Sequence, residues 1–181
     1  MRAAAAWTVF RLLLLVSTAS ATTVQTCETG TPPVSVDILD CDVPPCVFYR
    51  GESMSGNITF VTERPATSLR PDVLANIGGV EVNYQLPQQD ACQSLVSGSC
   101  PLQAGQTAVY SLVINILEMY PKVNLTVQLS LVDETEAVVT CFLVDGEVTD
   151  RNPPQARLRQ HQRRIRPMPS LLPRIPYHRL H

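Results

Sequence analysis

Short runs of alternating apolar and polar residues dominate the chain between residues 34 and 148. In the clearest run, residues 123–131, Val and Leu occupy every odd position, and Asn, Thr, Gln and Ser occupy the even ones. An extended strand turns successive side chains to opposite faces, whereas a helix would scatter these residues around its axis. Pro, Gly, Asn and Asp separate the runs, as is typical of strands joined by turns. The pattern predicts an all-β sandwich of roughly seven strands.

Weaker runs repeat this alternation at residues 110–116, at Ile58 with Phe60, and at Val80 with Val82. Two N-glycosylation sequons test the register, because a glycan can be attached only to an exposed asparagine. Asn57 and Asn124 both fall on the polar face of their predicted strands. A shift of one residue would turn either side chain toward the core. We therefore expect both asparagines to be exposed glycosylation sites.

The N-terminus has the composition of a targeting segment. Arg2 precedes an apolar stretch that ends with residues 12–16, and small residues follow as far as Ala19 and Ala21. Residues 1–21 are therefore predicted to be a secretory signal peptide. Arg11 interrupts the apolar stretch well below the roughly 20 residues that a membrane span requires. We expect a secreted protein, located outside the cell or in the lysosome.

Formal charge is divided unequally along the chain. Residues 22–150 hold all 16 acidic side chains and only four basic ones, so their formal charge is −12, whereas residues 151–181 hold eight arginines and no acid. The second segment is rich in Pro and Arg. Such a composition cannot bury enough apolar surface to offset the entropy lost on ordering, so residues 151–181 are predicted to be a disordered tail. The tail could attract anionic membranes or nucleic acid. It could equally fold loosely against the acidic domain, be removed by proteolysis, or reflect a misassigned gene end; no nucleic-acid partner is expected.

All six cysteines follow the predicted signal peptide, and an even number in a secreted chain predicts three disulfides. Six cysteines allow 15 pairings, among which the residues alone do not choose. Disulfide-bonded cysteines offer no thiolate to zinc, and no CxxC pair is present, so no metal site is expected.

Catalytic groups are missing from the predicted domain. All three histidines of the protein, the commonest general bases, lie in the predicted tail at positions 161, 178 and 181. No nucleophile-elbow, Walker or dinucleotide motif is present. The acidic cluster of Asp133, Glu134 and Glu136 lies in a turn-like setting, as does the pair Asp40 and Asp42, and such carboxylates are expected to be solvated loop charges. We expect no catalytic residue, no enzyme activity and no cofactor.

The cysteine spacing resembles that of the Niemann-Pick type C2 family, whose domain is called the ML (lipid-recognition) domain, and suggests an arthropod-like secreted member. Short segments carry the resemblance in the same order: Pro45-Cys46, Arg50-Gly51, residues 56–60, residues 79–84, Cys100-Pro101-Leu102 and Tyr120-Pro121. The resemblance covers about residues 24–148. The resemblance implies three disulfides: Cys27 with Cys141, Cys41 with Cys46, and Cys92 with Cys100.

The same resemblance implies an immunoglobulin-like two-sheet β-sandwich whose sheets leave an apolar cavity between them. An immunoglobulin domain itself is excluded, because the sole tryptophan lies in the predicted signal peptide. The sterol-contacting positions of the family match Tyr84, Ile116 and Tyr120 at the cavity mouth, with Val80 and Val82 as wall residues. Tyr84 replaces a phenylalanine of the family's type member, which predicts a more polar entrance. An ordinary solid core would show the same strand alternation.

The implied function is that of a secreted lipid carrier, which holds one sterol or fatty lipid and moves it in intracellular sterol transport and homeostasis. The bound lipid would be its ligand, and a membrane sterol transporter or receptor and membrane surfaces would be its partners, with the protein acting as a monomer. The alternative is an innate-immune accessory protein that binds microbial lipids; its phosphate recognition would call for a basic rim, which this acidic domain lacks. A third possibility is an adhesion module without a cavity.

Overall fold

A computed structural model describes residues 21–151, which form ten strands and one short 3-10 helix. Except for Ala21 and Arg151, the predicted signal peptide and the predicted tail lie outside the described residues. The elements are β1 (Gln25–Thr26), β2 (Ser35–Ile38), β3 (Cys46–Tyr49), β4 (Glu52–Val61), β5 (Leu69–Ile77), β6 (Val80–Tyr84), η1 (Ala91–Ser94), β7 (Leu95–Ser97), β8 (Thr107–Ile116), β9 (Asn124–Asp133) and β10 (Val138–Thr149).

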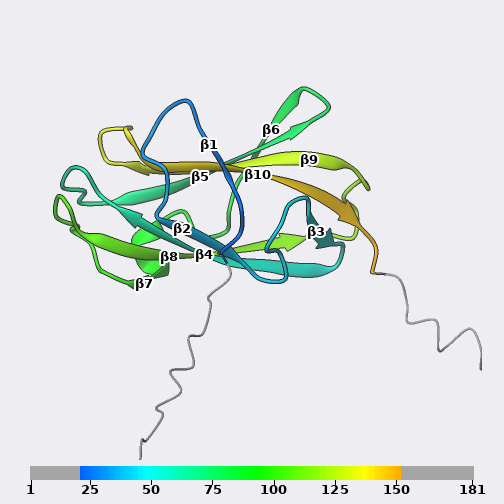
Figure 1. The fold of residues 1–181 in the computed structure, drawn as a ribbon, viewed down its shortest axis with the longest axis horizontal. Coiled ribbons are helices and arrows are strands. Elements are labelled where there is room, and N and C mark those ends of the chain that lie inside the picture. Colours follow the sequence, from blue (N-terminus) through cyan, green and yellow to red (C-terminus); the bar gives the residue numbers. More distant parts are fainter. Residues whose placement is uncertain (1–20, 152–181) are drawn as a thin grey trace, which may run out of the picture. The chain divides into compact units, whose positions relative to one another are not determined.

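The strands form two sheets that lie one over the other (Figure 1). The larger sheet has the order β1-β10-β9-β5-β6, and β3 also pairs with β10, in parallel; the smaller sheet has the order β2-β4-β8-β7. The predicted two-sheet sandwich is confirmed. The structure has ten strands instead of roughly seven because β1, β3 and β7 are only two, four and three residues long. Strands this short cannot display a recognisable alternation.

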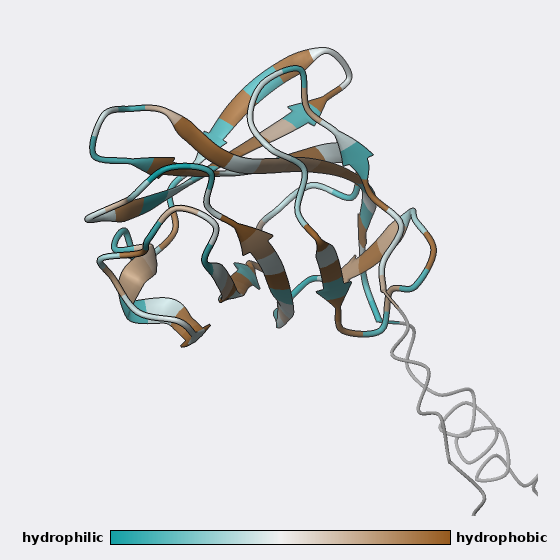
Figure 2. Cartoon of the chain, turned by 60° about the vertical axis from the view of Figure 1, so that its left-hand side comes forward, coloured by the Kyte–Doolittle hydropathy of each residue, from teal (hydrophilic) through white to brown (hydrophobic). Residues whose placement is uncertain are grey.

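The predicted alternation places apolar side chains between the sheets, and Figure 2 shows hydrophobic and hydrophilic bands alternating along the strands. In β8 the four residues Tyr110, Leu112, Ile114 and Ile116 are all buried, as expected for one strand face. Ser130 departs from the prediction, because it lies on the polar face of β9 and is nevertheless buried. It pairs with Cys141, whose disulfide to Cys27 draws the N-terminal segment across this part of the sheet.

Both sequon asparagines are exposed, so the predicted register of their strands is confirmed. Asn57 lies in the middle of β4, and Asn124 begins β9. We expect enzymatic removal of N-glycans to lower the mass of the expressed protein in two steps. Asn57→Gln and Asn124→Gln should each abolish one step, as measured by intact mass. An unchanged mass after enzyme treatment of the unsubstituted protein would contradict this prediction.

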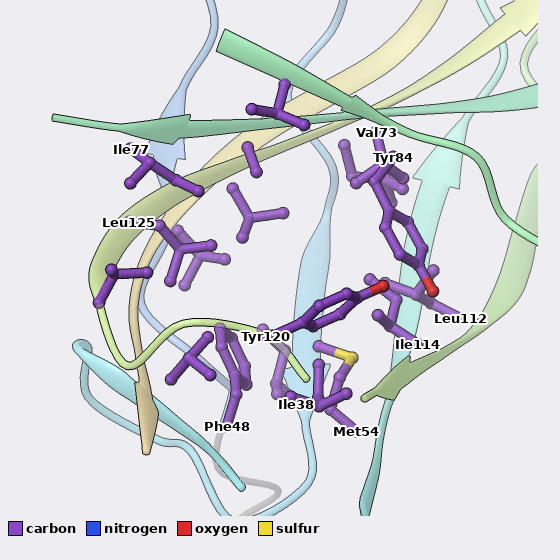
Figure 3. A pocket seen from close by; sticks show the side chains of 18 of the residues that line it. Ile38, Phe48, Met54, Val73, Ile77, Tyr84, Leu112, Ile114, Tyr120 and Leu125 are labelled. Carbon is purple, nitrogen blue, oxygen red and sulfur yellow. The ribbon is translucent and has the colours of Figure 1, made fainter. Parts of the chain in front are cut away.

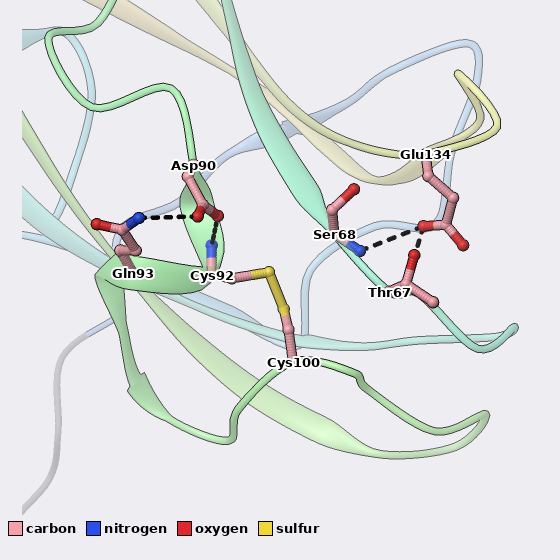
Figure 4. The surroundings of a disulfide bond; sticks show 7 residues. All are labelled: Thr67, Ser68, Asp90, Cys92, Gln93, Cys100 and Glu134. Carbon is pink, nitrogen blue, oxygen red and sulfur yellow. Dashed lines mark hydrogen bonds between the residues drawn. A yellow bond between two sulfur atoms is a disulfide. The ribbon is translucent and has the colours of Figure 1, made fainter.

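The structure contains the three disulfides that the family resemblance implies: Cys27–Cys141, Cys41–Cys46 and Cys92–Cys100. The first connects the N-terminal segment to β10 across 114 residues. The third connects η1 to the loop that precedes β8 (Figure 4). Asp90 caps η1, because its side chain accepts hydrogen bonds from the Cys92 amide and from the Gln93 side chain, each at 3.0 Å.

The acidic cluster between β9 and β10 is structural. Glu134 accepts hydrogen bonds from the backbone amides of Thr67 and Ser68 at 3.0 and 3.3 Å, which ties this hairpin to the start of β5 (Figure 4). Asp133 does not match the expectation of a solvated charge, since it is only 6% exposed. Its Oδ1 accepts hydrogen bonds from the Thr135 hydroxyl at 2.6 Å and from the Ala137 amide at 3.1 Å. The carboxylate therefore closes the hairpin turn.

Asp133→Asn is expected to lower the free energy of unfolding by about 1–2 kcal/mol at pH 7, because hydrogen bonds to a charged acceptor are stronger than neutral ones. The Thr135 hydroxyl, with the Ala137 and Thr135 amides, holds the pKa of Asp133 below its usual value. A depressed native pKa stabilises the fold above the unfolded-state pKa of about 4, and this stabilisation is lost as the pH falls through the native pKa. Urea unfolding at pH 7, 4 and 3 should show the difference between the two proteins shrinking in acid. A difference that grows in acid would contradict the assignment.

Candidate ligand-binding cavity

An apolar cavity of about 380 Å³ lies between the two sheets. Its walls come from both sheets, including β3 of the larger one, and from the loop between β8 and β9. Figure 3 shows their side chains pointing into a common space. Asn83, Tyr84 and Tyr120 are the lining residues with a polar side-chain group. The others are Ile38, Phe48, Met54, Val73, Ala75, Ile77, Val82, Leu112, Ile114, Ile116, Pro121, Val123, Leu125, Val127, Leu129, Phe142, Val144 and Val148.

The cavity occupies one half of the sandwich, and the other half is filled. Phe60, Leu102 and Leu131 are fully buried and do not line the cavity. Along β9, Leu131 belongs to the filled half, whereas Leu125 and Leu129 belong to the hollow half. All three lie on the same face of the strand. The cavity is therefore produced by what lies opposite β9, and not by any break in its pattern.

Phe48 lies at the edge of the hollow half and packs against β10 at Gly146. A Cβ at residue 146 would lie 2.2 Å from Cε2 of Phe48, which is well inside van der Waals contact. Glycine thus lets the ring lie close against the strand, so that the ring forms a wall of the cavity. A larger residue at position 146 would push the ring away from β10.

The structure brings together four of the five predicted ligand contacts. Tyr84, Ile116, Tyr120 and Val82 all line the cavity, although Val82 is 47% exposed. Val80 does not line it and is 64% exposed. The reason is tertiary, because β6 pairs only with β5 and the tip of this hairpin projects away from the sandwich (Figure 1). That these residues contact a ligand remains a prediction.

The polar groups of the cavity gather at one place. In Figure 3 the hydroxyl groups of Tyr84, from β6, and of Tyr120, from the loop after β8, are turned toward each other. Burial raises the pKa of Tyr84 above its ordinary value, and the neighbouring Tyr120 adds to the rise. Tyr84 is therefore a neutral phenol at physiological pH, able to donate and accept hydrogen bonds. An enclosed molecule would meet hydrocarbon on most sides and hydroxyl groups on one.

An ion-pair network holds the loop that carries Tyr120. Arg50 donates from Nη1 to the Tyr120 carbonyl at 3.2 Å and from Nε to Asp150 at 2.6 Å. Lys122 pairs with the same carboxylate. Lys122 and then Arg50 hold the pKa of Asp150 below its usual value, so the network persists at neutral pH. It fixes one side of the cavity mouth to the end of β10.

Residues 21–148 match the sequence profile of the ML domain. This chain belongs to the ML-domain family. The NPC intracellular cholesterol transporter 2 of Sus scrofa is 28% identical over 142 residues, covering 77% of this chain and 94% of the relative. The Drosophila melanogaster homolog a is 28% identical over 116 residues, covering 64% of this chain and 77% of the relative.

A solved structure shows the same fold. The Niemann-Pick type C2 protein from Japanese carpenter ant superposes with a TM-score of 0.63, covering 70% of this chain and 99% of that one, at 16% sequence identity. At this identity the likeness establishes the fold alone.

Several lining residues of the ML domain were not predicted individually. The alternation marks Leu125, Val127 and Leu129 as inward-facing, which is the signal that could have found them, but it does not separate a cavity wall from a solid core. Arg50 and Asp150 carry no such signal, because they are 100 residues apart.

Among residues 21–151, no three His, Cys, Asp or Glu side chains lie close enough to bind a metal ion. No helix in the same range is long and apolar enough to cross a membrane.

Proposed function

We propose that this protein binds one sterol-like molecule between its sheets and carries it between membranes or other carriers. The observation that supports this most directly is the cavity, whose walls are hydrocarbon except for the polar groups near Tyr84 and Tyr120. A sterol has the matching distribution, a rigid apolar body with a single hydroxyl group. As proposed, the protein acts as a secreted monomer outside the cell or in the lysosome.

Binding would be driven by removing the hydrocarbon of the ligand from water. Each Å² of apolar surface that is buried contributes about 25 cal/mol. Ligand pockets of proteins commonly enclose about 300–1,000 Å³, and this cavity lies within that range. The names of the relatives as intracellular cholesterol transporters support a sterol in particular. In this function no covalent bond is made or broken. Its exchange partners would be membrane surfaces and a membrane sterol transporter or receptor.

The microbial-lipid alternative is disfavoured by the charges around the domain. Phosphate-bearing lipids are usually held by arginine and lysine side chains that are free to bind them. In the described residues, Arg64 pairs with Asp133, Arg70 pairs with Glu136, and Arg50 and Lys122 share Asp150. Each of these cations already has an anionic partner. An adhesion module would not require an internal cavity, so the cavity also disfavours that alternative.

The first test is to identify the lipid that accompanies the secreted protein, by organic extraction and mass spectrometry, and to measure displacement of a fluorescent sterol by cholesterol. We expect one lipid molecule per protein and displacement at micromolar concentrations or below. Transfer of labelled sterol between two vesicle populations should accelerate on addition of the protein. Absence of extracted lipid together with absence of sterol binding would refute the proposal.

A further inference from the structure

A second pocket, of about 460 Å³, lies beside the cavity and has a different chemistry. We call it the polar pocket. Most of its lining residues carry hydrogen-bonding side chains. They are Arg70, Pro71, Asp72, Asn83, Tyr84, Gln85 and Gln89.

The polar pocket is formed where β6 ends. Tyr84, the last residue of β6, pairs with Val73, so β5 continues at Arg70 and Asp72 without β6 beside it. The chain then leaves the sheet through Gln85, and the Gln89 side chain donates to the Leu86 carbonyl at 2.5 Å, which folds this segment back on itself. The result is a notch at the edge of the sheet, between β5 and the departing chain.

The notch lies next to the cavity mouth. Arg70 and Asp72 lie on the outer face of β5, whereas Tyr84 faces the interior. Asn83 and Tyr84 line both the polar pocket and the apolar cavity. The two spaces are therefore neighbours that share a wall, and one amphipathic molecule could place its apolar part in the cavity and its polar part in the notch.

The side chains of the polar pocket favour a neutral group. Arg70 is already paired with Glu136 at 2.7 Å, and Asp72 would repel a phosphate or a sulfate. The amides of Asn83, Gln85 and Gln89 each supply both donors and acceptors. Hydroxyl groups also donate and accept, so a polyhydroxylated group can satisfy amides and the two ionic side chains together, whereas an anion can use only donors.

We propose that the polar pocket binds a neutral, polyhydroxylated headgroup, such as a sugar, on a lipid whose hydrocarbon body fills the cavity. This inference rests on the proposed function, because it extends the same ligand outward. It narrows the ligand class from apolar lipids in general to lipids, such as glycosylated sterols, that carry a neutral sugar.

The test compares three sterols as competitors of a fluorescent sterol: cholesterol, cholesteryl β-glucoside and cholesteryl sulfate. The unsubstituted protein should bind the glucoside about tenfold more tightly than cholesterol, the size expected from one or two net hydrogen bonds, and should not prefer the sulfate. Gln85→Ala should remove most of the preference for the glucoside while leaving the affinity for cholesterol unchanged, since Gln85 is exposed and lines only the polar pocket. Gln103→Ala, an exposed glutamine outside both pockets, is the matched control and should change neither affinity.

Equal affinities for cholesterol and its glucoside in the unsubstituted protein would overturn the inference and leave the proposed function standing. A preference for the sulfate, or a parallel loss of both affinities in Gln85→Ala, would also overturn it. Side-chain amide NMR signals of Asn83, Gln85 and Gln89 provide a readout that needs no sterol, because methyl β-glucoside should shift them at millimolar concentration. Shifts without any sterol binding would refute the proposed function and leave only a sugar site in the polar pocket, and absence of both would refute the two together.

Discussion

Val127→Phe is expected to lower the affinity for sterol about 100-fold or more, equivalent to about 2.7 kcal/mol, while the protein remains folded. Val127 lies in the middle of β9, lines the cavity, and pairs with Ala75 and Val144, which also line it. A phenyl ring at this position would project into the space that a rigid sterol needs. The fused rings of a sterol are rigid and cannot move aside, whereas the phenyl ring enters a void and does not displace packed side chains. The measurement is displacement of a fluorescent sterol, with the free energy of unfolding determined in parallel.

Val113→Phe is the matched control for this substitution. Val113 is also a strand valine, but it lies on the outer face of β8 and is 52% exposed. We expect its sterol affinity to be unchanged. The stability of Val127→Phe should stay within about 1.5 kcal/mol of the unsubstituted protein, because overpacking strain is partly relieved by the cavity. Undiminished sterol binding by folded Val127→Phe would show that the ligand does not occupy this cavity.

Removing the Cys27–Cys141 disulfide by replacing both cysteines with alanine is expected to lower the free energy of unfolding by about 5 kcal/mol. The bond closes a loop of 114 residues, and loop-closure entropy in the unfolded chain grows with loop length. The native state also depends on it, since β1 is only two residues long and pairs with β10 through those two residues. A loss of this size is comparable to the whole stability of many small domains. Denaturant unfolding under non-reducing conditions measures it.

The Cys41–Cys46 bond serves as the comparison, because it spans only five residues. Loop-closure entropy predicts that the corresponding double alanine variant loses about 2 kcal/mol. Equal losses in the two double variants would show that native-state strain or packing, and not loop closure, determines what each disulfide contributes.

Local sequence pattern was sufficient for β9 and β8, two of the strands that carry the cavity walls. The alternation of β9 and of β8 predicted which side chains face inward, because the side-chain direction in a strand depends only on the parity of the residue. The exposure of Asn57 and Asn124 followed from the same parity. The disulfide pairing and the mouth residues Tyr84 and Tyr120 came from the family resemblance, since residues distant in sequence leave no local trace of their contacts.

The odd or even position of a residue in a strand does not reveal which residues lie opposite that face of the strand. Val80 and Val82 have the right parity for a wall, yet Val80 is exposed, because β6 pairs only with β5 and the tip of this hairpin projects away from the sandwich. Asp133 looked like a loop charge and is a buried turn closure, because Thr135 and Ala137 fold back onto it. The polar pocket could not be predicted from the sequence, because it forms only where Arg70 and Gln89, which are distant in sequence, line the same sheet edge.

The sequence by itself determined an all-β chain, the inward face of its main strands, and the presence of enough cysteines for three disulfides. These properties depend on residues that are close together along the chain or on simple counts. Only the tertiary structure decided that Leu131 lies in a solid core while Leu125, on the same face of β9, lines a cavity. The physical reason is that empty space is a property of two opposed surfaces, and the separation of the sheets is set by packing between residues far apart in sequence.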